Sequence, residues 1–312
     1  MARPLVRLAG TFLALAGFGY VVWRFAQAGV WQQVSGSPYA LHLLGMAMAG
    51  APIYFVGLCA MTLAWWCTQA AFMPSRPPVR PLFAVFAATQ FAKYLPGNIG
   101  HFVGRHVMLR RYGMGHAALL GGTLADAAFQ LCAALVWVAG NVTVLVPALR
   151  IDITPWEVLL LEATGLLLLI GLLRRLRAGG SKLSERLSLH QPAWLLASLP
   201  MHLVLFGFMA VALMLSAHVL PIDAKGIWLL PGAAATSWVA GFLVIGAPAG
   251  LGVREAVFIA LLHGHLPEAD ILLLAAAFRI TTFSGDILLL LFGLLLGSGR
   301  MQQGQQAHAS RA

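Results

Sequence analysis

The chain has 312 residues, of which 60% are hydrophobic and only 10% are charged. Soluble domains carry about 25% charged residues, so this composition excludes a soluble fold and any sizeable soluble catalytic domain. The formal net charge of +10 indicates basic loops attracted to anionic headgroups, because no stretch could form the basic soluble face that a nucleic acid needs. We therefore expect an all-α polytopic membrane protein.

A helix needs about 20 mostly apolar residues to cross a bilayer. The first long apolar segment precedes a stretch, 26–28, that resembles a signal-peptidase site, but the segment is long enough to anchor and we expect it to be retained. The second and third segments exceed one crossing, so they are expected to tilt or to kink, with Pro52 as a kink site. The six segments are Leu5–Phe25, Ala40–Phe72, Gly115–Val146, Trp156–Leu173, Trp194–Leu220 and Ile271–Gly297.

Two further apolar regions, Leu82–Leu95 and Gly226–Ala247, each end at a Pro-Gly break. Basic residues flank the first region on both sides, which predicts a re-entrant hairpin entered from the cytoplasm. The second region is then a hairpin entered from outside, and two full crossings, giving eight spans, are the alternative. This topology places 14 of the 20 Lys and Arg residues inside, Arg105 among them, only Arg150 and Lys225 in outer loops, and both termini in the cytoplasm.

The two breaks predict an internal repeat. Residues 96–100 read PGNIG and residues 248–252 read PAGLG, an offset of 152, and each break lies between an apolar run and a short amphipathic stretch. The order span, span, hairpin, span occurs twice, and an odd number of crossings inverts the second copy. We expect inverted repeats at about residues 5–147 and 156–298, followed by a disordered cytoplasmic tail, 299–312.

Unwound backbone at membrane depth is tolerated where it is buried in protein or lines a cavity, and a half-helix N-terminus suits an anionic group. Charged side chains beside the breaks are costly in the bilayer and therefore mark a candidate site. Glu255 and Arg279 are expected to form a buried ion pair, to bind the ligand, or to do both. The candidate substrate-binding residues are Lys93, Pro96, Gly97, Asn98, Gly100, Arg105, Pro248, Gly250, Gly252, Arg254, Glu255 and Arg279.

Other polar residues are assigned no chemistry. The histidines on apolar segments (His42, His202 and His218) are interpreted as ordinary polar contacts, whereas His101 and His106 are set apart by lying near the first break. The three cysteines lack metal-ligand spacing and are interpreted as small buried hydrophobic residues. We expect no metal, no cofactor and no catalytic residues.

Residues 248–256, PAGLGVREA, resemble the P-x-G-[LI]-G-x-x-E signature of the lysylphosphatidylglycerol synthase transmembrane-region family, also called the flippase-like domain. Residues 93–100, KYLPGNIG, resemble that family's earlier motif, so the resemblance covers roughly residues 5–298. It implies a domain that moves lipids between leaflets of the bacterial cytoplasmic (inner) membrane. The sequence contains no synthase domain, so a lipid aminoacyltransferase is not expected. It also lacks the Glu-Arg pair expected shortly before Asp126.

The leading hypothesis is translocation of a lipid or lipid-linked anionic substrate. No G-x-x-x-x-G-K-[ST] motif occurs, so ATP is not expected to drive it directly. The alternative is a membrane enzyme acting on a polyprenyl-phosphate or glycolipid, although the first break offers neither a hydroxyl nucleophile nor an adjacent arginine. The expected partners are membrane lipids with anionic headgroups and a separate lipid-modifying enzyme, with no nucleic acid.

Overall fold

A computed structural model describes residues 37–94, 99–110, 114–139, 189–244 and 247–309, with 160 and 171 as single residues, and its side chains are described up to residue 297. The expected spans Leu5–Phe25 and Trp156–Leu173 lie outside these ranges, apart from those two single residues. Every regular element in the described part is an α-helix or a 3-10 helix.

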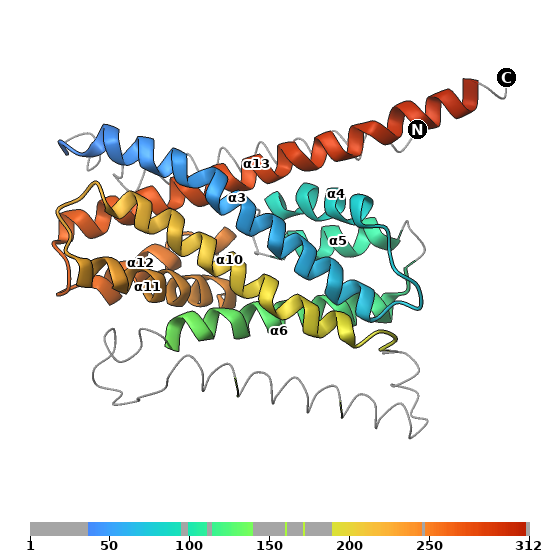
Figure 1. The fold of residues 1–312 in the computed structure, drawn as a ribbon, viewed down its shortest axis with the longest axis horizontal. Helices are drawn as coiled ribbons and strands as arrows, with labels where there is room; N and C mark the ends of the chain where they lie inside the picture. The colour runs from blue at the N-terminus through green and yellow to red at the C-terminus, as the bar shows by residue number, and fades with distance from the viewer. Residues whose placement is uncertain are drawn as a thin grey trace.

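Five described helices are long and apolar enough to cross a membrane. They confirm an all-α polytopic membrane protein, and they match four of the expected spans together with the apolar run of the second hairpin region. They are α3 (Ala40–Ala71), α6 (His116–Ala139), α10 (Ala193–Ala217), α11 (Ala224–Leu243) and α13 (Glu268–Ala309) (Figure 1).

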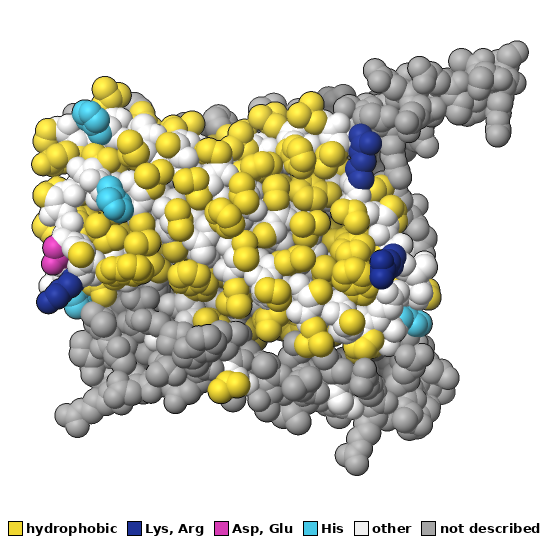
Figure 2. All heavy atoms as spheres, in the orientation of Figure 1, with side chains coloured by type: hydrophobic (Ala, Val, Ile, Leu, Met, Phe, Trp, Pro, Cys, Tyr) yellow, Lys and Arg dark blue, Asp and Glu magenta, His cyan; other side chains and the backbone are white. Residues whose placement is uncertain are grey.

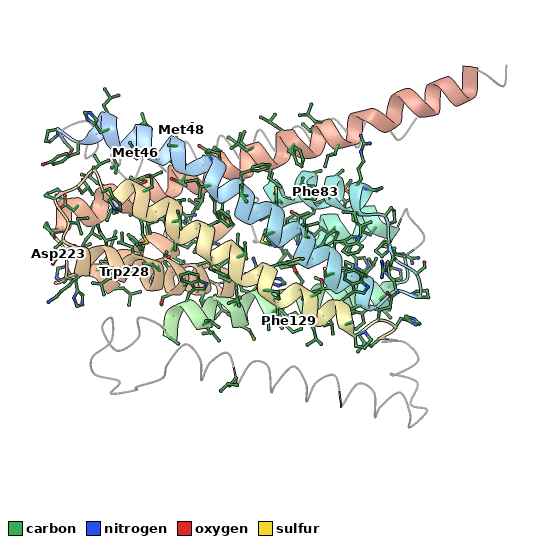
Figure 3. All side chains as sticks on the ribbon, in the orientation of Figure 1. Met46, Met48, Phe83, Phe129, Asp223 and Trp228 are labelled. Carbon is green, nitrogen blue, oxygen red and sulfur yellow. The ribbon has the colours of Figure 1, made fainter. Side chains whose placement is uncertain are left out.

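The described surface is suited to lipid. Figure 2 shows a broad apolar face, with the coloured Lys, Arg, Asp, Glu and His side chains gathered toward the two ends of the long axis. Large apolar side chains point outward from it, among them Leu41 and Leu295, which are 78% and 71% exposed. Trp228 and Asp223 lie together at one end (Figure 3), where an amphipathic indole is favoured at the membrane–water boundary.

The longest helices exceed one crossing. At about 1.5 Å per residue, the 32 residues of α3 extend about 48 Å, against a hydrocarbon core of about 30 Å. The helix accordingly runs obliquely (Figure 1), and it continues unbroken through Pro52. Helix α13 continues to Ala309, which differs from the disorder expected from residue 299, because Met, Gln and Ala readily extend a helix that has already formed.

Both hairpin regions contain helices too short to cross: α4 (Val79–Gln90) and α5 (Gly100–Arg110) in the first, and α12 (Val253–Leu262) in the second. In the first, η1 (Phe91–Tyr94) follows α4, and in the second α11 leads through η3 (Pro248–Gly250) to α12. Helices α5 and α12 have 11 and 10 residues, or about 15 Å each, half of the hydrocarbon core. These lengths favour hairpins over the alternative of eight full spans.

Equivalent helices of the two sequence halves run in opposite directions. Gly50 of α3 lies against Ala212 of α10, and Gly57 lies against Leu205, so the two helices are antiparallel (Figure 1). Each hairpin also packs on the final helix of the other half, α4 on α13 and α11 on α6. The repeat boundaries 5–147 and 156–298 include undescribed segments and stay a prediction.

Element η1, which precedes the first break, meets the second break inside the protein. Elements η1 and η3 are in contact, and Phe91, Tyr94 and Ala249 form a buried apolar cluster between them. The second break is sharply turned, because Ala249, Gly250 and Gly252 all have left-handed backbone, with φ of 50°, 69° and 83°. Glycine adopts this conformation without steric cost, which explains two of the three positions.

Candidate functional site

An ion pair joins the two halves where η1 meets the second break. The Lys93 ammonium lies 2.6 Å from Asp286 Oδ2, and the Tyr94 hydroxyl donates to the same oxygen at 2.6 Å. The Lys93 side chain is 13% exposed and that of Asp286 is fully buried. Lys93 and Tyr94 come from η1 and Asp286 from α13, so this contact fixes the first break to the second half.

Glu255 and Arg279 form the predicted ion pair, with the guanidinium Nε donating to Glu255 Oε1. Arg279 also donates to the carbonyls of Ala249 and Gly250, at 3.3 and 3.1 Å, so it holds the second break against α13. The other carboxylate oxygen of Glu255 accepts from the Gly252 N–H at 2.7 Å. The N-terminus of α12, expected to be free for an anionic ligand, is therefore closed by a side chain of its own first turn.

Arg105 occupies a buried position between α4 and α6. Its Nη2 donates to Gln90 Oε1 at 2.5 Å, its guanidinium lies 3.6 Å from the Phe86 ring centroid, and its Nη1 is 3.9 Å from Asp126 Oδ2. The side chain is 4% exposed. Arg105, which the sequence predicts on the cytoplasmic flank, is thus buried in the protein, because α5 folds back and carries it inward to a carboxylate and a ring.

Asp126 has a second partner from the other half. Its Oδ1 lies 3.0 Å from His202 Nε2, and His202 Nδ1 lies 2.9 Å from the Ser198 carbonyl oxygen. The side chains of Asp126 and His202 are 3% and 0% exposed. The interpretation of His202 as a satisfied polar contact is confirmed, but its partner is the one carboxylate on α6.

A small pocket of about 40 Å³ lies among these groups and is partly open to the outside. Its lining combines aromatic and aliphatic side chains with three cations and a carboxylate. Its lining residues are Tyr54, Met61, Phe86, Gln90, Lys93, His101, Phe102, Arg105, Asp126, Gln130, Leu205, Trp238, Phe242 and Arg254.

Arg254 is the cation that this pocket leaves without a carboxylate. Lys93 and Arg105 each have an acidic neighbour, whereas Arg254 forms no ion pair within the described ranges and lies 5.8 Å from the Trp238 ring centroid. Its Nε is buried and has no hydrogen-bond partner among the described residues, and the same holds for Arg105 Nε and His101 Nδ1. Unsatisfied buried nitrogens of this kind are rare, and three at one pocket indicate a site suited to an acceptor-rich anion.

The structure thus brings together only part of the predicted site. Lys93, Arg105 and Arg254 line the pocket, whereas Glu255 and Arg279 do not and instead stabilise the break. Gly100 begins α5, and Pro248, Gly250 and Gly252 shape the second break. Pro96, Gly97 and Asn98 lie outside the described residues. The sequence prediction missed the other eleven lining residues, of which Gln90 and Gln130 were signalled by their polarity within apolar segments.

The chain matches no family model and no curated protein. The resemblance to the lysylphosphatidylglycerol synthase transmembrane-region family therefore stays a prediction. Within the described ranges, no group of three or more His, Cys, Asp or Glu side chains is placed to hold a metal ion. The function is thus argued from the pocket alone.

Proposed function

We propose that this multi-pass membrane protein moves a lipid or lipid-linked substrate with an anionic headgroup between the leaflets, without direct use of ATP. The observation that carries the proposal is Arg254, a cation among membrane helices that faces a pocket and has no carboxylate partner in the described part. An unpaired charge in the bilayer interior costs about 2.5–3.5 kcal/mol on insertion scales. A bound anion offsets that cost.

The pocket walls support an amphiphilic ligand. The lining combines three cationic side chains, Lys93, Arg105 and Arg254, with aromatic side chains such as Phe86 and Trp238. Such walls suit an anionic headgroup joined to apolar chains. The pocket also lies beside the meeting point of η1 and the second helix break in an antiparallel arrangement, which is the usual position of the substrate in transporters built from inverted repeats.

The proposal is tested with the purified full chain in phosphatidylcholine liposomes that carry a short-chain fluorescent phosphatidylglycerol. We expect faster exchange of this lipid between leaflets than in empty liposomes. Arg254→Gln should slow it about 10- to 100-fold, because a hydrogen bond to a charged group contributes about 1.5–3 kcal/mol. Equal rates in empty and protein-containing liposomes would refute the proposal.

The matched control is Arg76→Gln. Arg76 also lies over a tryptophan ring, 4.9 Å from the Trp194 centroid, but it is exposed at the end of the bundle, so exchange should be unchanged. A fluorescent phosphatidylcholine tests whether the protein moves any lipid or only an anionic one. A soluble glycerol phosphate tests whether the phosphate alone is sufficient for binding. Chemical conversion of the probe, followed by thin-layer chromatography, would instead indicate the membrane-enzyme alternative.

A further inference from the structure

The hydrogen bonds of His202 determine how many protons it shares with Asp126. Its Nδ1 lies 2.9 Å from the Ser198 carbonyl oxygen, which can only accept, so Nδ1 carries a proton. Its Nε2 lies 3.0 Å from Asp126 Oδ1. A bare ring nitrogen and an ionised carboxylate at that distance would oppose two lone pairs, so a second proton lies between them.

This second proton is shielded from the surface of the protein. The side chains of His202 and Asp126 are 0% and 3% exposed, and the Phe129 ring lies edge-on to the imidazole, with centroids 6.3 Å apart. The proton is shared either as imidazolium and carboxylate or as imidazole and carboxylic acid. In both forms the pair holds one proton more than a neutral imidazole beside a carboxylate.

Asp126 connects this proton to the pocket. The carboxylate lines the pocket and is flanked by His202 on one side and Arg105 on the other. Arg105 is 3.9 Å away, too far for a hydrogen bond, and its Nε has no partner among the described residues. Arg105 can therefore bind an incoming anion. The bound anion would offset part of the positive charge that Arg105 presents to Asp126.

The remaining charges around the pair strengthen this dependence. Helix α10, which carries His202, packs against α3, α6, α11 and α13. Among the described residues, α11 contributes only aromatic side chains to the pocket, and two charges within α13, Arg279 and Asp286, are paired with Glu255 and Lys93. The other titratable or charged groups that line the same pocket are Tyr54 from α3, Lys93 from η1, His101 and Arg105 from α5, and Arg254 from α12.

We infer that Asp126 and His202 form a proton-binding site whose occupancy is coupled to that of the pocket, so that an anionic headgroup and a proton are bound together. An anion near Arg105 adds negative charge beside Asp126 and favours the shared proton, and by linkage the proton favours the anion. The proton site rests on the hydrogen bonds alone, whereas the coupling rests on the proposed function. A transmembrane proton gradient would then supply the driving force.

The proton site is tested directly, without any ligand. If the pair is imidazolium and carboxylate, ¹⁵N-labelled histidine in the purified protein should give a signal from a ring with both nitrogens protonated, and His202→Gln should remove that signal. If the pair is imidazole and carboxylic acid, the infrared spectrum should show a protonated carboxyl that Asp126→Asn removes. In Asp126→Asn the amide N–H can donate to Nε2, so His202 should become neutral with its proton on Nδ1. An unprotonated Nε2 beside an ionised Asp126 in the wild-type protein would overturn the inference.

The coupling is tested in the liposomes with fluorescent phosphatidylglycerol. Its apparent affinity should rise as the pH falls, by up to about tenfold per pH unit for one linked proton, and this slope should vanish in Asp126→Asn. His218→Gln should keep the slope, because His218 bonds an i−4 carbonyl of the same helix, as His202 does, but has no carboxylate partner in the described part. Transport with no pH slope would overturn the coupling alone, whereas no transport at any pH would overturn the proposed function and leave the spectroscopic result standing.

Discussion

Replacing Asp286 with asparagine would leave the Lys93 ammonium without a carboxylate inside the protein. The two side chains are 0% and 13% exposed, and Asp286 binds both the ammonium and the Tyr94 hydroxyl at 2.6 Å. Removing one partner of a buried ion pair costs about 3–5 kcal/mol. Asparagine keeps an oxygen that accepts from Tyr94, so we expect the lower end, about 3 kcal/mol. Unfolding in detergent mixed with increasing sodium dodecyl sulfate measures this loss.

The double-mutant cycle isolates the interaction. Lys93→Met alone leaves a buried carboxylate, whereas Lys93→Met combined with Asp286→Asn removes both charges and should recover about 2 kcal/mol or more relative to the sum of the single changes. Lys225→Met is the matched control, because Lys225 is exposed and should change stability by no more than about 0.5 kcal/mol. Additive effects of the two single changes would refute the ion pair as a stabilising contact between the halves.

Two glycine substitutions test the close packing of α4 on α13 and of the second break. A Cβ at Gly293 would clash with the Cβ of Ala87, so Gly293→Ala should lower stability by about 1–3 kcal/mol, measured as a lower midpoint of thermal unfolding in detergent. Gly297→Ala, at a position with open space, should be neutral or slightly stabilising, and an equal loss in both variants would contradict the packing argument. Gly250→Ala should also destabilise, by about 1–3 kcal/mol, because Gly250 has φ of 69° and its Cβ would lie 2.8 Å from Arg254 Nε; an unchanged midpoint would show that the break relaxes freely.

The membrane-spanning helices were largely predictable because each crossing of a bilayer requires a long, mostly apolar segment. The expected span Ala40–Phe72 ends within one residue of α3, and the breaks lie where proline and glycine interrupt apolar runs. The Glu255–Arg279 pair was also predictable, since both residues lie beside one break. These features depend on local sequence or on neighbours in one half.

The contacts between the halves could not be predicted in the same way. Lys93 pairs with Asp286 and Asp126 pairs with His202, at separations of 193 and 76 residues. Helical periodicity indicates which face a residue occupies, but not which distant helix lies opposite that face. His202, a single polar residue on an apolar helix, therefore gave no signal that its partner was the carboxylate of α6.

The exchange of hairpins between the halves has a mechanical consequence. Helix α4 of the first half packs on α13, and α11 of the second half packs on α6, so each hairpin is anchored to the opposite repeat. A movement of one half of the sequence against the other would break the contacts of α4 with α13 and of α11 with α6. A body that moves without separating these contacts therefore combines elements from both halves of the chain.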